Sequence, residues 1–307
     1  MGDKKRYALA FDIGGSKLVS GIVDSGGAVA ATEYYYWSSL TEAEVLGAVI
    51  RSGQKLLSAF GGPVECVGAA IPGLADPETG VWIESCFSGI RDIPVADILK
   101  KEFKTGVYID NDVNMCAVGE KMFGACADCG NFAWLTVSNG CGGAVYINGN
   151  IYRGAFGNAG EFGHITVEED EGLLCGCGNK GCLEAQASGR GIYNRYRGSN
   201  KNGPANDAAE IAESARSGDR AAIEIYEKEG VYLGRAIAAI INTLNPETVI
   251  IGGGVSQSFD LFEKSMTETV RRRIYLKANP SVQIRRTELG YFAPLIGAGA
   301  AAMENFK

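Results

Sequence analysis

The first 36 residues consist of three short apolar runs separated by glycine-containing turns. The runs are 7–11, 18–23 and 28–36, and the turns between them contain Gly14-Gly15 and Gly26-Gly27. Short runs of aromatic, β-branched and small residues between turn residues predict β-strands. We therefore predict a three-stranded β-meander at the start of the chain.

A similar pattern recurs from residue 132 onward. The runs 132–137, 144–147 and 151–153 are separated by the glycine-rich turn 138–143 and by Asn148-Gly149, which is typical of a tight hairpin. A repeated meander indicates an internal duplication, and duplicated lobes commonly enclose a ligand-binding cleft. The sequence thus predicts two similar lobes around a cleft.

Longer segments with helical spacing of apolar residues lie between and after these strands. In 41–60 this spacing is preceded by Thr41, which with Glu44 has the pattern of a capping box. We predict an α/β fold with a smaller lobe (1–112 plus 292–307) and a larger lobe (113–291). The further predicted helices are 94–103, 113–123, 185–197, 207–217, 219–244, 258–276 and 294–306, and the further strands are 64–71, 81–83, 107–109, 248–251 and 282–286.

The composition is that of a globular protein of about two domains. Of 307 residues, 46% are hydrophobic and 21% are charged, and the net charge is −7. This charge disfavours sequence-independent binding to nucleic acid or to an anionic membrane, and no uninterrupted apolar stretch has membrane-spanning length. Nine cysteines without a secretory leader favour a reducing, cytoplasmic compartment.

One histidine and three cysteines are clustered in the second half of the chain. His164, the only histidine, is followed by Cys175, Cys177 and Cys182 in the spacing His-x10-Cys-x-Cys-x4-Cys. One imidazole and three thiolates complete a closed tetrahedral zinc site. Because the set includes a histidine and no further cysteine lies nearby, zinc is favoured over an iron–sulfur cluster. We therefore predict a structural zinc. The alternative is three buried thiols and a core histidine, which is uncommon for such a cluster.

Two glutamates flank the predicted zinc ligands. Glu161 precedes His164 by three residues, and Glu184 follows Cys182 by two. A loop fixed by zinc would hold both carboxylates and the far nitrogen of His164, an arrangement that suits a hydroxyl-rich ligand. The alternative is that both are solvated surface charges, as most glutamates are.

A polar triplet follows the predicted strand 107–109. Asp110, Asn111 and Asp112 lie at its C-terminal end, where open α/β sheets present ligand-binding groups. The predicted helix 113–123 comes next, and its dipole favours a carboxylate at Asp112. Asp112 is thus a candidate site residue, and the alternative is a simple helix N-cap.

Three glycine-rich turns are suited to nucleotide binding. Gly14-Gly15 is followed by Ser16 and Lys17, and exposed backbone N–H groups in such a turn bind phosphate oxygens. The turn 138–143 has the same character, and 252–254 presents bare backbone to a flat ring. The spacing is not that of a P-loop, and a glycine pair alone often serves only a hairpin.

Six motifs in this order resemble the ROK family of sugar kinases and sugar-responsive repressors, within the actin-like ATPase superfamily. The resemblance covers nearly the whole chain. Its most specific part is the EFGH motif together with the CGCGNKGCLE motif. It implies a duplicated ribonuclease-H-like fold, ATP with Mg²⁺ in the cleft, and a hexose phosphorylated at its 6-hydroxyl. The motifs are DIGGSK (12–17), AIPG (70–73), DNDVN (110–114), EFGH (161–164), CGCGNKGCLE (175–184) and IIGGGVS (250–256).

The resemblance also implies a role for each matching residue. Asp112 would be the catalytic base, and Gly253 and Gly254 would face the adenosine. Because Glu161 and Glu184 are far in sequence from the glycine-rich turns, we expect them to set sugar affinity and not ATP affinity. Sugar hydroxyls would be held by Gly73, Asn111, Asp112, Glu161, His164 and Glu184, and the phosphates with their metal by Asp12, Gly14, Gly15, Ser16, Lys17, Asn139, Gly140 and Gly142.

The sequence departs from the family pattern at two places. The second phosphate turn of the family usually reads TGTGIGG. Here it is VSNGCGG, so Asn139 replaces a hydroxyl residue. The second departure lies before the DNDVN strand, where the family commonly has an Asn-Leu pair and a tryptophan but this chain has Cys86-Phe87 and Ile90-Arg91. Glucose is the expected substrate. The alternatives are an N-acetylmannosamine or other N-acetylhexosamine kinase, and a sugar-binding ROK protein without turnover. Only eleven residues precede Asp12, so we expect no N-terminal DNA-binding module, and we expect a cytoplasmic homodimer.

Overall fold

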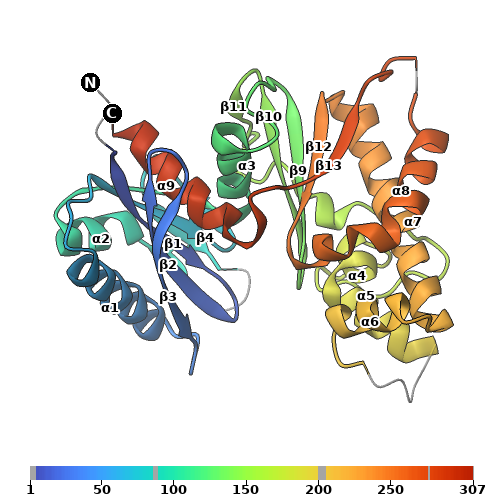
Figure 1. Cartoon of the computed structure of the whole chain (residues 1–307), viewed down its shortest axis with the longest axis horizontal. Helices are drawn as coiled ribbons and strands as arrows, with labels where there is room; N and C mark the ends of the chain where they lie inside the picture. Colours follow the sequence, from blue (N-terminus) through green and yellow to red (C-terminus); the bar gives the residue numbers. More distant parts are fainter. Residues whose placement is uncertain (1–4, 86–88, 200–204, 276, 307) are drawn as a thin grey trace. The chain divides into compact units, whose positions relative to one another are not determined.

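The computed structural model describes residues 5–85, 89–199, 205–275 and 277–306, and the chain forms two compact units (Figure 1). Unit 1 comprises Met1–Asp128, Arg153–Asn158 and Tyr291–Lys307, and unit 2 comprises Cys129–Tyr152 and Ala159–Gly290. The chain therefore passes from one unit to the other after residues 128, 152, 158 and 290.

Unit 1 is built on a five-stranded sheet with the order β3-β2-β1-β4-β8. The first three strands are antiparallel neighbours, whereas β1 and β4, and β4 and β8, pair in parallel. The predicted meander is therefore confirmed. The strand bounds are β1 (Tyr7–Ile13), β2 (Lys17–Asp24), β3 (Val29–Tyr36), β4 (Cys66–Ile71) and β8 (Gly106–Asn111).

The two faces of this sheet carry side chains of different size. Along β1, Leu9 and Phe11 belong to a core cluster with residues of α1 (Glu42–Phe60) and α2 (Val95–Phe103). Ala10, which points to the opposite face, packs with residues of α3 (Asp112–Phe123) and α9 (Ala293–Asn305). Small side chains let α9 approach closely, because a Cβ on Gly68 would collide with the carbonyl of Ala298.

Two details of unit 1 differ from the predictions. The strand predicted at 81–83 is β6 (Val81–Glu84), which pairs with two unpredicted strands, β5 (Leu74–Asp76) and β7 (Arg91–Ile93). The capping box of α1 is half formed: Thr41 accepts a hydrogen bond from the Glu44 N–H at 3.4 Å, but the Glu44 side chain accepts from the Tyr35 hydroxyl instead. The departure noted at Cys86-Phe87 lies outside the described residues.

Unit 2 repeats the topology of unit 1. Its sheet has the order β11-β10-β9-β12-β13, with an antiparallel meander followed by two parallel pairings. The duplication predicted from the two glycine-turn meanders is therefore confirmed. The bounds are β9 (Phe132–Val137), β10 (Cys141–Ile147), β11 (Asn150–Ile151), β12 (Thr248–Gly252) and β13 (Gln283–Arg286).

The helices of unit 2 follow the predictions except at one break. The helix predicted at 185–197 is two helices, because Ser188 leaves the helical conformation and the Gly189 N–H donates to the Ser138 carbonyl at 2.7 Å. Every described helix is too short or too polar to cross a bilayer. The bounds are α4 (Leu183–Ala187), α5 (Gly189–Ser199), α6 (Ala208–Arg216), α7 (Arg220–Leu244) and α8 (Phe259–Arg273), with short 3-10 turns η1 (Phe162–His164) and η2 (Gly254–Ser258).

Candidate functional site

Two carboxylates interact in unit 1, where β1 and β8 end. Asp12 is the sixth residue of β1, and Asp112 begins α3 directly after β8. Enclosure by the protein and the negative charge of Asp112 raise the pKa of Asp12 to about 7, and Lys17 partly opposes this effect. Two carboxylates that disfavour each other's charge form a site that favours a cation or a proton.

Asn111, not Asp112, caps helix α3. The side-chain oxygen of Asn111 accepts hydrogen bonds from the Val113 and Asn114 N–H groups at 2.9 and 3.1 Å. Its side-chain NH₂ donates to the Gly73 carbonyl at 2.9 Å, so two predicted sugar-site residues are in contact. Asp112 therefore lies in the first helical turn, where the helix dipole favours its negative charge, and the N-cap alternative for Asp112 is wrong.

The first glycine-rich turn joins β1 to β2. The Gly14 N–H donates to the Lys17 carbonyl at 2.9 Å, so this amide closes the hairpin. The Gly14 carbonyl in turn accepts a hydrogen bond from the Trp37 indole N–H at 2.8 Å. Lys17 Nζ lies 4.8 Å from the centre of the Tyr291 ring, and a hydrogen bond with Tyr291 raises the pKa of Lys17. Gly15 and Ser16, between these fixed residues, are exposed.

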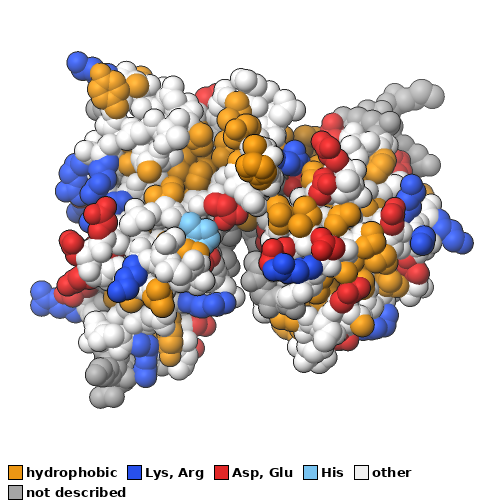
Figure 2. Space-filling model, turned by 180° about the vertical axis from the view of Figure 1, so that it is seen from behind, with side chains coloured by type: hydrophobic (Ala, Val, Ile, Leu, Met, Phe, Trp, Pro, Cys, Tyr) orange, Lys and Arg blue, Asp and Glu red, His pale blue; other side chains and the backbone are white. Residues whose placement is uncertain are grey.

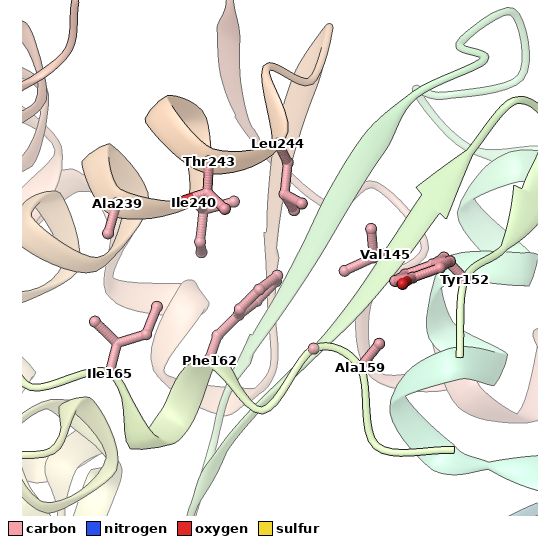
Figure 3. Close-up of a pocket in the computed structure, with 10 residues that line it drawn as sticks. Val145, Tyr152, Ala159, Phe162, Ile165, Ala239, Ile240, Thr243 and Leu244 are labelled. Atoms are coloured by element: carbon pink, nitrogen blue, oxygen red, sulfur yellow. The ribbon is translucent and has the colours of Figure 1, made fainter. Parts of the chain in front are cut away.

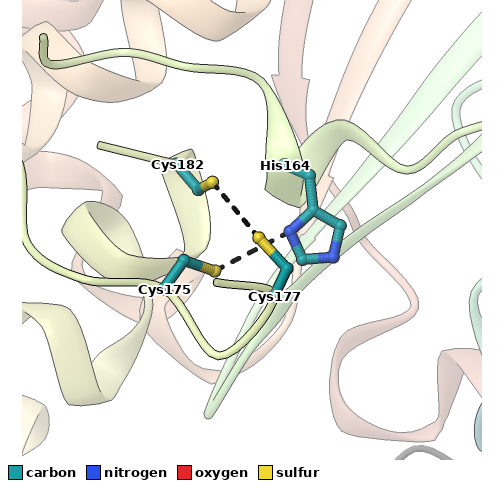
Figure 4. A group of neighbouring side chains, drawn as sticks. All are labelled: His164, Cys175, Cys177 and Cys182. Atoms are coloured by element: carbon teal, nitrogen blue, oxygen red, sulfur yellow. Dashed lines mark hydrogen bonds between the residues drawn. The ribbon is translucent and has the colours of Figure 1, made fainter. Parts of the chain in front are cut away.

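The four predicted zinc ligands come together in unit 2 (Figure 4). Their ligand atoms all lie within 4.8 Å of one another. Cys175 Sγ is 3.8 Å from His164 Nδ1, and Cys177 Sγ is 3.7 Å from Cys182 Sγ. Zinc–sulfur and zinc–nitrogen bonds of about 2.3 and 2.0 Å in a tetrahedron require separations of roughly 3.5–3.8 Å. The donor set and its spacing therefore fit one zinc ion with His164 Nδ1 as the imidazole ligand.

The loop that carries the sulfurs depends on glycine and on thiol chemistry. Gly178 and Gly181 have φ angles of +92° and +76°, in the left-handed region that favours glycine. A backbone hydrogen bond at Asn179 lowers the pKa of the exposed Cys177 to about 7, whereas burial raises the pKa of Cys182 to about 12. Zinc binds thiolates, so its binding would release the remaining thiol protons.

The other nitrogen of His164 is turned away from the sulfurs. His164 Nε2 lies 3.8 Å from Glu161 Oε2, and the two side chains are 39% and 62% exposed. Figure 2 shows the pale-blue imidazole at the molecular surface. An imidazole that binds zinc through Nδ1 carries its proton on Nε2, so this nitrogen can donate a hydrogen bond to a ligand.

Glu184 connects the cysteine loop to the glycine-rich turn after β9. Its Oε2 accepts a hydrogen bond from the Cys141 N–H at 3.1 Å, and its Oε1 lies 4.0 Å from Cys175 Sγ. A Cβ on Gly140 would lie 2.6 Å from Oε2, so a larger residue there would displace the Glu184 carboxylate. Glu184 is therefore not remote from the glycine-rich turn 138–143, contrary to the expectation from its distance in sequence.

A cavity of about 650 Å³ in unit 2 unites two predicted nucleotide-binding segments. It is lined by Asn139, from the turn after β9, and by Gly254, which begins η2. The preceding residue, Gly253, has a φ of +85°, and a Cβ there would collide with the backbone of Val137. The volume of this cavity is within the range of small-molecule sites.

Most residues that line this cavity were not predicted. Arg216 at the end of α6 is fixed by ion pairs with Glu213 at 2.6 Å and with Asp260 at 2.8 Å. The polar face of an amphipathic helix has the same pattern whether it faces solvent or a cavity, so the sequence contained no signal for the lining positions on α6. The unpredicted polar lining residues are Ser138, Asp207, Glu210, Glu213, Arg216, Tyr226, Gln257 and Ser258.

The family model for "ROK family" matches residues 8–305 of this chain. The chain belongs to the ROK family. The order of the six motifs and the duplicated topology agree with this assignment, so the resemblance seen in the sequence is confirmed.

Relatives of this ROK chain include enzymes and regulators. It is 32% identical to a glucokinase of Halalkalibacterium halodurans over 96% of the chain and 94% of that protein. It is 31% identical to a xylose repressor of Bacillus spizizenii over 78% of the chain and 61% of that protein. Among solved structures, a ROK family glucokinase from Streptomyces griseus in complex with glucose and AMPPNP is 28% identical, with a TM-score of 0.84 over 97% of this chain and 99% of that one.

A second cavity in the ROK chain has a different chemical character (Figure 3). It has a volume of about 290 Å³ and lies beside η1 and α7, where Phe162, Ile240 and Leu244 point toward it. Among the described residues that line it none is charged. The cavity uses Phe162 of the EFGH motif and none of the predicted ligand-binding residues.

Proposed function

We propose that this ROK chain is an ATP-dependent hexose kinase that transfers the γ-phosphate of ATP to the 6-hydroxyl of a hexose. Glucose is the proposed substrate. The similarity to a glucokinase over nearly the full length of both proteins supports a sugar kinase. The observation that carries the proposal is the interaction of Asp12 with Asp112 at the strand ends of unit 1. Phosphoryl transfer needs both a base and a cation, and one pair of carboxylates suits both needs.

Asp112 is the proposed catalytic base. A sugar hydroxyl is a poor nucleophile, and a carboxylate within hydrogen-bond reach orients it and accepts its proton. The first turn of α3 places Asp112 where the helix dipole favours a negative charge, and the cap by Asn111 fixes that turn. Because the transition state is loose, the proton leaves late and positioning contributes as much as basicity.

Asp12 is the proposed holder of the metal. A Mg²⁺ ion bound with the nucleotide would neutralise charge on the transferred phosphoryl group. The raised pKa of Asp12 supports this role, because a carboxylate that resists ionisation beside Asp112 is stabilised by a nearby cation.

The sugar-binding residues proposed for unit 1 are Asn111 and Gly73, and those proposed for unit 2 are Glu161, His164 and Glu184. Zinc at Nδ1 would fix the imidazole of His164 and leave Nε2–H as a donor for a sugar oxygen. The zinc has a structural role in this proposal because all four of its positions are taken by protein atoms.

The proposed nucleotide site uses the cavity of about 650 Å³ for the adenosine. Gly254 lines this cavity and directly follows Gly253, the other glycine proposed to face the adenosine, and Asn139 with Gly140 and Gly142 is proposed as the phosphate turn. The turn of Gly14, Gly15, Ser16 and Lys17 is proposed as the second phosphate contact. An asparagine amide still donates to phosphate oxygen, so Asn139 is compatible with turnover.

Two alternatives remain testable. The repressor similarity favours a sugar-binding ROK protein without turnover, and Asn139 in place of the family's hydroxyl residue points the same way. The other alternative is a kinase of N-acetylmannosamine or another N-acetylhexosamine. The proposed location is the cytoplasm and the proposed assembly a homodimer.

A coupled ADP-release assay across a panel of hexoses and N-acetylhexosamines tests the proposal. Glucose should give the largest kcat/KM. Asp112→Asn should lower kcat by about 10²–10⁴-fold, the usual contribution of a general base, while sugar binding measured by calorimetry weakens much less. Sugar binding without ADP release in the wild type would favour the non-catalytic alternative.

A further inference from the structure

Asp110 is a buried carboxylate that hydrogen-bonds to residues on both sides of Asp112, the residue proposed as base. It is the last residue but one of β8, two positions before Asp112, and is 1% exposed. Its Oδ1 accepts hydrogen bonds from the Asn111 N–H at 2.7 Å and from the Asn114 side-chain NH₂ at 3.0 Å. One carboxylate thus ties the end of the strand to the first turn of α3.

The counter-charge of Asp110 comes from a distant part of the sequence. Arg153 begins the segment Arg153–Asn158, which belongs to unit 1 although the residues on either side belong to unit 2. Its Nη2 forms an ion pair with Asp110 Oδ2 and donates to the Tyr108 hydroxyl at 3.2 Å. Its Nε is buried and has no hydrogen-bond partner among the described residues.

Stability alone does not account for this pair. The Asp110 side chain is buried although that of Arg153 is 32% exposed. Burying a paired carboxylate is costly enough that an apolar pair of similar volume is often at least as stable. The unpartnered Nε adds to the cost. A polar network retained in spite of such costs commonly fixes the geometry of a site.

We propose that Asp110 and Arg153 are a positioning pair for the phosphoryl-transfer step. Arg153 holds the Asp110 carboxylate in place through their ion pair, and that carboxylate holds the backbone that carries Asn111 and Asp112. This inference rests on the proposed kinase function, and neither residue is assigned a contact with substrate. The pair sets the direction of the Asp112 carboxylate, which matters because a misplacement of about 1 Å can cost about 10²-fold in rate.

The test compares kcat, measured by ADP release, with the sugar dissociation constant, measured by calorimetry. Asp110→Asn keeps an oxygen for the Asn111 and Asn114 donors and removes the charge, so it preserves the fold best. Arg153→Gln and the double variant complete a cycle. The matched control is Asp24→Asn, because Asp24 is also buried in unit 1, pairs with Lys5 at 2.6 Å, and accepts from the Gly26 and Ala28 N–H groups at 2.9 Å.

Each single variant of the pair should lower kcat by about tenfold or more, with the sugar dissociation constant changed less than about threefold. The kcat of the double variant should be no lower than that of the more impaired single variant, because the two residues act as one unit. Asp24→Asn should keep kcat within about twofold, because Asp24 is the last residue of β2 and pairs with Tyr7, at the opposite end of β1 from Asp12.

Two results overturn the inference. One is a loss of kcat in the Asp110 and Arg153 variants no greater than that of Asp24→Asn. The other is a loss of sugar affinity as large as the loss of kcat. A wild-type protein that binds sugar but releases no ADP would instead refute the kinase function, and the inference would fall with it.

Discussion

At the scale of single residues, the charge of Asp12 opposes folding. Its pKa is raised from the ordinary value near 3.8 to about 7, because enclosure and the neighbouring Asp112 disfavour the ionised form. Between about pH 4 and 7 the folded chain holds a proton that the unfolded chain has released. The stability contributed by this residue is therefore present at low pH and is lost as pH rises toward 7.

Replacement of Asp12 by Asn should stabilise the protein at neutral pH, although it should lower activity. Without divalent cations, the free energy of unfolding at pH 8 should rise by roughly 2–4 kcal/mol, and the difference should vanish near pH 4. Denaturant unfolding at several pH values measures this. Asp24→Asn should show the opposite sign, because Lys5 and two backbone N–H groups outweigh burial and lower the pKa of Asp24. A less stable Asp12→Asn protein at pH 8 would contradict the argument.

The contact of Glu184 with the Cys141 N–H changes what its substitution should do. Glu184→Gln should raise the KM for ATP as well as for sugar, each on the order of tenfold, because a hydrogen bond to a charged group is weakened at the phosphate turn. Glu161→Gln is the matched comparison, since Glu161 is exposed and lies beside His164. It should raise only the sugar KM. Steady-state kinetics with each substrate varied decide this, and an unchanged ATP KM in Glu184→Gln would refute it.

The identity of site residues was more predictable than their contacts. The spacing of His164 and the three cysteines was sufficient to predict their cluster, because four N/S ligands so close in sequence have few other uses. The contacts of Asp110 with Arg153 and of Glu184 with Cys141 were not predictable, since they join segments distant in sequence. Only the fold brings such partners together.

At the scale of elements, the cysteine loop has little regular structure of its own. Between η1 and α4 it forms two isolated β-bridges, of Thr166 with Cys182 and of Leu174 with Lys180, and a few backbone hydrogen bonds such as that from the Gly181 N–H to the Leu173 carbonyl. A loop without a helix or a full strand is stabilised substantially by a metal that crosslinks it. Zinc is therefore expected to determine whether this loop is ordered.

Purified protein should contain about one zinc per chain, and the double variant Cys177→Ser, Cys182→Ser should contain none. Elemental analysis measures the zinc, and sugar calorimetry reports the consequence for Glu161 and His164. Cys129→Ser is the control, because Cys129 lies away from the cluster, 3.8 Å from the Thr248 hydroxyl. Zinc retained undiminished in the double variant would disprove the ligand assignment.

Strong periodicity made most elements predictable, and tertiary contacts decided the exceptions. The long helix α7 and the strands of both meanders follow from apolar spacing. The three-residue strands β5 and β7 are too short to show a period. The break at Ser188 depends on the Ser138 carbonyl, which accepts the Gly189 N–H and thereby separates α4 from α5.

At the scale of the whole molecule, unit 1 is completed by α9. The helix packs against the alanine face of the sheet and against α3, and a Cβ on Gly297 would collide with the Met115 carbonyl. Each unit has its own hydrophobic core, and the buried core residues of unit 2 all come from 129–152 and 159–290. Loss of α9 should therefore affect the two units unequally.

A chain that ends at residue 290 should keep unit 2 folded and lose the packing of unit 1. In hydrogen exchange, β9 and β12 should stay protected while β1 and β4 lose protection, because Ala10 and Ala70 would be exposed. Gly297→Val in the full chain should have a milder effect of the same kind. Equal loss of protection in both units would show that they are one cooperative body.

The return of the chain to unit 1 after residue 290 has a consequence for biosynthesis. On the ribosome, β1, β2 and β4 are made early, yet the helix that covers their alanine face is made only after all of unit 2. Unit 2 can reach its native state first, while the face that awaits α9 stays open to solvent and to chaperones. The order in which the units mature would thus be the reverse of the order in which they are translated.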